Sequence, residues 1–377
     1  MKIDIIGAGI GGLTTAIALK QKGFTARVFE QAKEIKPVGA GIILANNAMQ
    51  VYEKLGLKDF IEQNGNPISS MNITKANLQQ ISEIDLTFFE KKYQVKNIAI
   101  HRGALQQILM EQLTTEELYL DHQLHKIESN QEEVLLQFEN GHQEQSPLVI
   151  GADGLRSNVR QQLFDKTTIR HAHQICWRGV TDFDLPDHYK NELNEAWGKT
   201  DRFGFLQIAE NKVYWYALKS FSDHKEEFRG EKIEKFFTEY HPIVNEIITS
   251  TSQNQINTAE ISDLKPTRQW FHQNVCLMGD AAHATTPNMG QGACQAVEDA
   301  NVLAECLSKY KSQQAFQVFQ KLRMPKAHQV VKTSWRVGKV AHLSNPILRW
   351  CRNQLMQFTP SSFNQEQYKQ LFKISNI

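Results

Sequence analysis

Three glycines near the N-terminus restrict the fold of this chain more than any other feature. Gly7, Gly9 and Gly12 stand between an apolar run at residues 3–6 and a helical pattern at residues 14–22. In a G-x-G-x-x-G turn the first glycine permits a tight turn and the second lets a pyrophosphate approach the backbone. The third brings helix and strand together. The helix N-terminus then faces the phosphate charge, so the pattern favours a dinucleotide site.

A carboxylate at the end of the next apolar run strengthens this interpretation. Glu30 follows the run at residues 26–29, where an acid can accept hydrogen bonds from a ribose 2′-OH. An ordinary glycine-rich turn would account for the glycines alone. It would not account for strand, helix, second strand and terminal acid in this order, so we expect a dinucleotide-binding unit.

The bulk properties exclude several classes of protein. The 377 residues exceed what a single core usually holds, and a net charge of +1 gives no overall field suited to nucleic acid or to an anionic membrane. The five cysteines are scattered and form no C-x-x-C pair, which argues against a disulfide framework or a metal site and for a cytoplasmic location. No apolar run reaches 18 residues, so we expect no integral membrane segment.

The pattern changes along the chain between parallel α/β and antiparallel β. Residues 68–86 alternate like a hairpin, and residues 175–182, 203–208 and 213–218 read as antiparallel strands rich in aromatic side chains. After residue 313 the pattern is helical. We therefore expect an α/β fold in which a Rossmann-like domain contains an inserted, mostly antiparallel β domain. The expected domains are residues 1–67, 98–170 and 265–325 for the nucleotide, residues 68–97 and 171–264 for the substrate, and C-terminal helices at 326–377.

Two positions after predicted strands are candidates for cofactor contacts. Arg102 follows the strand at residues 98–100, where a guanidinium either reaches a phosphate or ribitol hydroxyl or is an exposed first-turn side chain. Asp153 and Gly154 follow a strand at residues 148–150, and the aspartate can hold loop amides or cofactor hydroxyls. We expect the Asn140-Gly141 turn to join this strand to the one at residues 134–138 as a hairpin.

A second glycine-rich segment lies near residue 280. Asp280 follows the apolar run at residues 275–278, and Pro287, Gly290 and Gly292 precede a long helix. The glycines leave amides uncovered at the start of that helix, where they can stabilise negative charge on a bound group.

These segments together resemble the group A flavoprotein monooxygenases, the family of para-hydroxybenzoate and salicylate hydroxylases. Residues 7–12 with Glu30 are similar to the ADP-binding unit of that family, residues 151–160 to its Asp-Gly motif, and residues 279–292 to its Gly-Asp motif. Residues 36–42 and 285–300 look most like the urate hydroxylase, 3-hydroxybenzoate hydroxylase and zeaxanthin epoxidase branch.

The resemblance implies the chemistry. It implies a bound FAD, NADH or NADPH as a transient electron donor, and O2. It also implies hydroxylation of a small, aromatic or heteroaromatic substrate through a flavin C4a-hydroperoxide by a monomer or homodimer. Three alternatives stay open: a reductase or desaturase of the same fold, an epoxidase of an isoprenoid, and a flavin-bound interaction protein.

The resemblance also names candidate substrate residues. Urate hydroxylase uses an arginine and a tyrosine at its substrate, and Arg202 and Tyr214 match those positions; Arg178 is a further candidate for the pocket. Arg202 could instead cap a strand end and Tyr214 could be a half-buried sheet aromatic. Both reach one pocket only if they share a face of the sheet.

Overall fold

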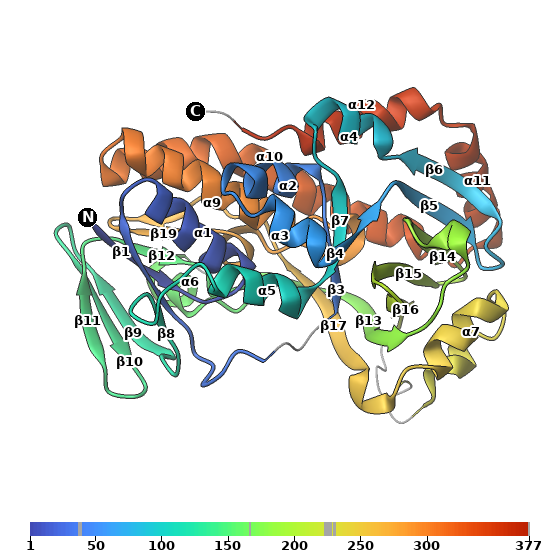
Figure 1. The fold of residues 1–377 in the computed structure, drawn as a ribbon, viewed down its shortest axis with the longest axis horizontal. Coiled ribbons are helices and arrows are strands. Elements are labelled where there is room, and N and C mark those ends of the chain that lie inside the picture. The colour runs from blue at the N-terminus through green and yellow to red at the C-terminus, as the bar shows by residue number, and fades with distance from the viewer. Residues whose placement is uncertain (37–39, 166, 222–227, 229–230, 376–377) are drawn as a thin grey trace.

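The computed structural model describes residues 1–36, 40–165, 167–221, 228 and 231–375, and it contains the expected α/β core (Figure 1). Part of the 36–42 segment, residues 37–39, lies outside this range. The core is a six-stranded sheet in the order β18-β19-β12-β1-β2-β8. Its strands are β1 (Lys2–Ile6), β2 (Thr25–Phe29), β8 (Leu118–Tyr119), β12 (Val149–Gly151), β18 (Phe271–His272) and β19 (Val275–Leu277).

All neighbours in this sheet except β18 and β19 are parallel. Continuous apolar runs form such strands because helices and loops bury both of their faces, as for the fully buried Ile3 and Ile5. Helices α1 (Ile10–Gln21), α5 (Arg102–Met110) and α9 (Gly292–Lys309) pack together on this side of the molecule.

One predicted hairpin is wrong. The Asn140-Gly141 turn joins β10 (Val134–Phe138) to β11 (Gln143–Ser146), with β9 (Leu124–Ser129) on the other edge. The strand ending at Ile150 is instead β12, parallel to β1. The polar sequence of β11 suits an exposed edge, whereas the apolar β12 requires a buried position.

A small antiparallel sheet connects the core to the rest of the chain. It consists of β3 (Gly41–Leu44), β4 (Gly65–Ile68) and β7 (Asn97–His101), with α2 (Asn46–Lys54) and α3 (Lys58–Gln63) between the first two strands. Strand β4 spans residue 67, where the first domain boundary was expected.

The second large sheet, called the substrate sheet below, has seven strands in the order β17-β13-β16-β15-β14-β5-β6. They are β5 (Ser70–Lys75), β6 (Gln80–Asp85), β13 (Ile169–Asp182), β14 (Glu192–Trp197), β15 (Asp201–Ala209), β16 (Lys212–Ser220) and β17 (Asn257–Leu264). Only β14 and β5 pair in parallel. Helix α7 (Pro242–Thr249) covers an aromatic core on one face of this sheet, which includes Trp177, Phe203 and Trp215.

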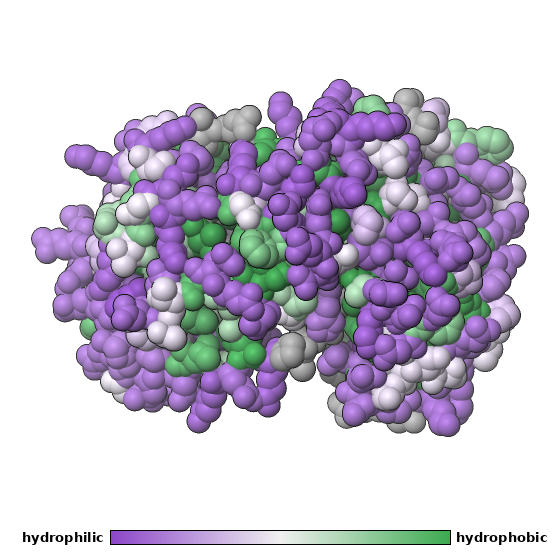
Figure 2. Space-filling view, viewed as in Figure 1, coloured by the Kyte–Doolittle hydropathy of each residue, from purple (hydrophilic) through white to green (hydrophobic). Residues whose placement is uncertain are grey.

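The C-terminal helices run along both halves (Figure 1). Helix α10 (Ser312–Ala341) continues through Pro325 and packs on α9, and α11 (Pro346–Phe358) and α12 (Ser361–Phe372) lie against β6. The short helices α4 (Thr87–Tyr93), α6 (Asn158–Leu163) and α8 (Asp280–His283) complete the fold. The face in Figure 2 is mostly hydrophilic. No helix in the described ranges is long and apolar enough to span a bilayer.

Candidate flavin and substrate site

The glycine-rich turn has the geometry that a pyrophosphate requires. Gly7 has φ of +106°, and a Cβ there would lie 2.6 Å from the Ala152 oxygen. A Cβ on Gly12 would lie 1.9 Å from the Gly7 oxygen, whereas a Cβ on Gly9 would meet nothing within 4 Å. Helix α1 begins beside this open space with no side-chain cap and no acid in its first turn. Its amides are therefore free to bind an anion.

Glu30 lies directly after β2 and fixes this turn from the other side. Its Oε2 accepts a hydrogen bond from the Ala8 amide at 2.8 Å, and Oε1 accepts one from the Ala32 amide at 2.9 Å. The carboxylate thus stands beside the turn at the end of the strand, where the ribose of a dinucleotide would lie.

The Asp-Gly segment reaches the Gly-Asp segment through a buried arginine. Asp153 Oδ2 accepts from the Val159 amide at 3.1 Å, while Oδ1 is buried without a hydrogen-bond partner in the described part of the chain. Burial raises the pKa of Asp153. Gly154 follows with φ of +80°, and Arg160 Nη1 donates to the Ala281 oxygen at 2.7 Å. A buried carboxylate oxygen without a partner fits a cofactor hydroxyl.

The Gly-Asp segment supplies the remaining predicted cofactor residues. Asp280 begins α8 and is partly accessible to solvent. The surrounding protein desolvates its carboxyl group, which raises the pKa of Asp280. His283 and then Arg102 act against this shift of the Asp280 pKa. Pro287 begins a 3-10 turn, Gly290 has φ of +61°, and Gly292 begins α9 without a side-chain cap.

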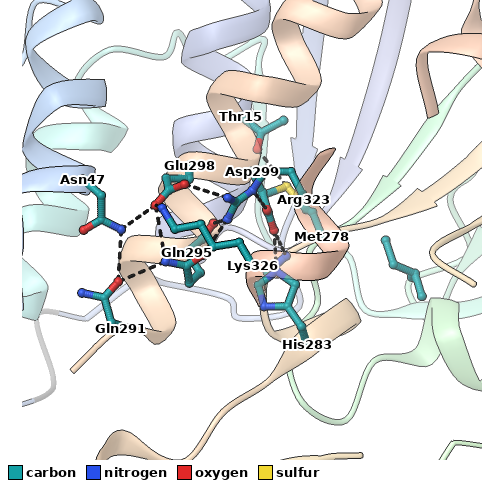
Figure 3. Close-up of polar contacts among 12 residues, drawn as sticks. Thr15, Asn47, Met278, His283, Gln291, Gln295, Glu298, Asp299, Arg323 and Lys326 are labelled. Carbon is teal, nitrogen blue, oxygen red and sulfur yellow. Dashed lines mark hydrogen bonds and ion pairs between the residues drawn. The ribbon is translucent and has the colours of Figure 1, made fainter. Parts of the chain in front are cut away.

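A buried polar network holds these segments in place (Figure 3). Arg323 of α10 donates to Asp299 at 2.7 Å and to Glu298 at 2.6 Å, and all three side chains are fully buried. Asp299 also accepts from the Gly279 amide at 2.9 Å and contacts His283 Nε2 at 2.6 Å. The position of the Gly-Asp loop therefore depends on α10.

The three candidate substrate residues lie on one face of the substrate sheet. Arg202 on β15 is opposite Leu218 on β16. Tyr214, Tyr216 and Leu218 are alternate residues of β16. Arg178 on β13 is opposite Tyr216. Opposite residues and alternate residues share a face, so Arg178, Tyr214 and Arg202 point to the same side.

This face of the substrate sheet is turned towards β3 and the Gly-Asp segment. The Tyr214 ring packs on Gly41 of β3, where an added Cβ would lie 2.5 Å from the ring. Arg202 is 1% exposed and donates to Glu195 Oε1 at 3.1 Å and to Asn288 Oδ1 in the Gly-Asp segment. Sequence segments separated by more than 80 residues thus meet at Arg202.

Two residues of this arrangement were missed from the sequence. Glu195 accepts from both Arg202 and the Tyr216 hydroxyl. Its strand β14 contains two glutamates, one asparagine and one alanine, which are weak strand formers, and it was not predicted. Asn288 stands in the predicted Gly-Asp loop, and only the fold brings it to Arg202. Among the described residues, no group of three or more His, Cys, Asp or Glu side chains could hold a metal ion.

A dinucleotide site on a mostly parallel sheet, together with a second, mostly antiparallel sheet, is the arrangement of a two-part enzyme with a dinucleotide cofactor. The chain belongs to the FAD binding domain family, whose model matches residues 1–334. The resemblance to flavoprotein monooxygenases is thereby confirmed, and the open space at Gly9 and the unpartnered Asp153 oxygen fit FAD.

Similar proteins support the same class over the whole chain. Aurachin C monooxygenase/isomerase of Stigmatella aurantiaca is 34% identical, with 96% of this chain and 95% of that protein covered. The 2-heptyl-3-hydroxy-4(1H)-quinolone synthase of Pseudomonas aeruginosa is 29% identical, with 99% and 98% covered. The structure of Klebsiella pneumoniae HpxO with FAD and uric acid has the same fold, with a TM-score of 0.90 at 24% identity and coverage of 99% and 96%.

Proposed function

We propose that this protein uses NADH or NADPH and O2 to hydroxylate a small heteroaromatic substrate on the face that carries Arg178, Tyr214 and Arg202. The observation that carries the proposal is that these three side chains share one face of the substrate sheet, where Arg202 contacts Asn288 of the Gly-Asp loop. FAD, when bound, supplies the redox chemistry, and the chain supplies orientation and exclusion of water. The five free cysteines and the single glycine fingerprint support a cytoplasmic enzyme with a transient nicotinamide donor.

Tyr214 is suited to donate a hydrogen bond to the substrate. Burial raises the pKa of its hydroxyl, with partial opposition from the charge of Arg178, so the group stays protonated at neutral pH. No hydrogen bond from a described residue occupies this hydroxyl. Because Tyr214 is almost fully buried, a substrate that accepts a hydrogen bond from its hydroxyl would leave water little access to the tyrosine ring.

Arg202 is suited to orient the substrate on this face. Its Nη1 and Nη2 are held by Glu195 and Asn288, while Nε is buried and has no partner in the described part of the chain. An acceptor on the substrate, such as a ring carbonyl, would satisfy that N–H. The quinolone named in the P. aeruginosa relative has such a carbonyl, so we propose a 4-quinolone or a similar fused ring as substrate.

A turnover screen tests the proposal. The FAD-loaded protein is incubated with NADH or NADPH and with 2-alkyl-4-quinolones, urate or hydroxybenzoates. The reaction is run in isotopically labelled O2, and product masses are measured by mass spectrometry. We expect one substrate class to accelerate nicotinamide oxidation and to gain one oxygen atom from O2. A reduced or desaturated product without that oxygen would replace this proposal with the reductase alternative.

Tyr214→Phe and Tyr189→Phe form a matched pair for the substrate face. Tyr189 packs on Phe205, on the opposite face of the substrate sheet. We expect Tyr214→Phe to lower kcat/KM for product by up to about tenfold, the effect of one hydrogen bond. Tyr189→Phe should not. Equal effects in the two variants would remove Tyr214 from the site.

A further inference from the structure

Helix α11 packs on the protein with its polar side. Arg352 is 7% exposed and donates through Nη1 to the backbone oxygens of Val340 and Ala341 at 3.1 and 3.0 Å. Its guanidinium also lies 4.7 Å from the centre of the Trp197 ring. An ordinary surface helix buries its apolar stripe and exposes its charges, so α11 is reversed.

The apolar side of α11 faces solvent. Its large apolar side chains are more than half exposed: Ile347 71%, Leu348 53%, Trp350 63%, Leu355 73% and Phe358 76%. Ile347, Leu355 and Phe358 follow one another at helical spacing with the exposed Cys351 between them, so they form one stripe. Figure 1 shows α11 at the outer edge of the molecule, beside β5 and β6. We call this stripe with Trp350 and Leu348 the α11 face.

The segment that contains α11 has an excess of basic residues. No Asp or Glu occurs between Glu305 and Glu366, where ten Lys or Arg residues occur. Arg323 and Arg352 are buried members of that set, and β6 beside α11 carries the exposed Glu83 and Asp85. A cavity of about 760 Å³ lies between α11 and the substrate sheet. Among the described residues that line it, six are Lys or Arg and two are Asp or Glu.

We propose that the α11 face docks on an anionic phospholipid bilayer, with the helix lying in the plane of the interface. Helices that bind in this way carry Trp, Phe and Leu on one side and basic groups around them. Anionic headgroups attract Lys and Arg near the surface. A second copy of this chain would place one basic segment against another, which opposes self-association through this face.

Vesicle flotation of the FAD-loaded protein tests the proposal. The protein should float with vesicles of phosphatidylglycerol mixed with phosphatidylcholine. A much smaller fraction should float with vesicles of phosphatidylcholine alone. The triple variant Ile347→Ser, Leu355→Ser, Phe358→Ser should lose binding by at least about tenfold. Phe60→Ser is the matched control, since Phe60 is 52% exposed on α3, away from this face. It should bind like wild type.

Cys351 provides an independent measurement. It is the exposed cysteine of the five, and the other four are buried, so a polarity-sensitive thiol dye labels the α11 face selectively. Its emission should shift to shorter wavelength with anionic vesicles and return at high salt. An unshifted dye with no flotation would overturn the proposal. So would a solution dimer that the triple variant abolishes, because a second copy would then cover the face. Flotation requires no turnover, so its result stands apart from the proposed reaction.

Discussion

Arg202 on the substrate sheet donates a hydrogen bond to the side-chain oxygen of Asn288, in the turn that precedes the N-terminus of α9. The Asn288 amide in turn donates to Thr286 Oγ1 at 2.9 Å and to the Ser334 oxygen of α10 at 2.8 Å. One side chain therefore joins the substrate sheet, the Gly-Asp loop and a C-terminal helix. In the proposed site, a substrate contact at Arg202 would therefore be linked directly to the Gly-Asp loop.

Asn288→Ala should break this link while leaving the glycine-rich turn intact. We expect FAD affinity to stay within about threefold of wild type, while a larger share of nicotinamide oxidation yields peroxide instead of product. Product and peroxide are measured in the same reaction. Asn288→Asp keeps an acceptor for Arg202 and should couple better than Asn288→Ala. If both variants uncouple equally, the Arg202 contact is not the cause.

Gly9→Ala and Gly12→Ala should separate cofactor binding from folding. A Cβ on Gly9 meets open space, so the free protein should unfold at the wild-type temperature while FAD affinity falls. A Cβ on Gly12 would overlap the Gly7 oxygen and should destabilise the protein by about 1–3 kcal/mol even without FAD. Thermal unfolding with and without FAD measures both effects. Equal loss of stability in the two variants would contradict the assignment.

Arg323→Met should be the more costly of two substitutions on α10. It leaves the buried carboxylates of Glu298 and Asp299 without their shared cation, which costs about 3–5 kcal/mol. Lys321→Met on the exposed side of the same helix should change the free energy of unfolding by less than about 0.5 kcal/mol. Urea unfolding compares them. A small effect at Arg323 would mean that Lys326 and His283 suffice to hold the two acids.

His342 should make the fold less stable in mild acid. Burial, with the charge of Arg202, lowers the pKa of this histidine to about 3, and its Nδ1 contacts the Thr200 oxygen at 2.9 Å. The unfolded chain takes up a proton near pH 6.5 and the folded chain does not. Stability is therefore lost as the pH falls from about 6.5 towards 3, by about 2 kcal/mol between pH 7 and 5.

His342→Gln should flatten that part of the stability curve. The difference between wild-type and variant free energies of unfolding, measured in urea from pH 7 to 5, isolates the histidine from other titrating groups. His125→Gln, at an exposed histidine, should follow the wild-type curve. A wild-type dependence in His342→Gln would show that another group is responsible.

The motifs of the dinucleotide-binding half could be predicted from the sequence because each lies within a short segment. Gly7, Gly9 and Gly12 act within one turn, and the two later motifs, residues 151–160 and 279–292, each begin at or just after the end of a buried strand. Asp280 and Arg102 could each be named because both follow a short apolar strand in the sequence.

The contacts of the substrate sheet could be predicted only in part. They depend on strand register and on pairing between residues that are far apart in the sequence. A shift of one residue between β15 and β16 would have turned Arg202 and Tyr214 to opposite faces. Strand β14, which carries Glu195, has weak strand propensity and is held by its neighbours β15 and β5. No pattern around Asn288 indicated that a strand 86 residues earlier would meet it.

The central sheet also sets an order of events for the growing chain. Strand β1 is among the first residues made, but its sheet gains β12 at residues 149–151 and β19 only at residues 275–277. Five of the seven strands of the substrate sheet are synthesised between β12 and β19, and the uncovered start of α9 follows at Gly292. The glycine-rich turn is thus made early, whereas the start of α9 is made after about three quarters of the chain. In the proposed site, the complete cofactor-binding surface therefore forms late, and a ribosome stalled before α9 would hold a chain with the glycine-rich turn but without the start of α9.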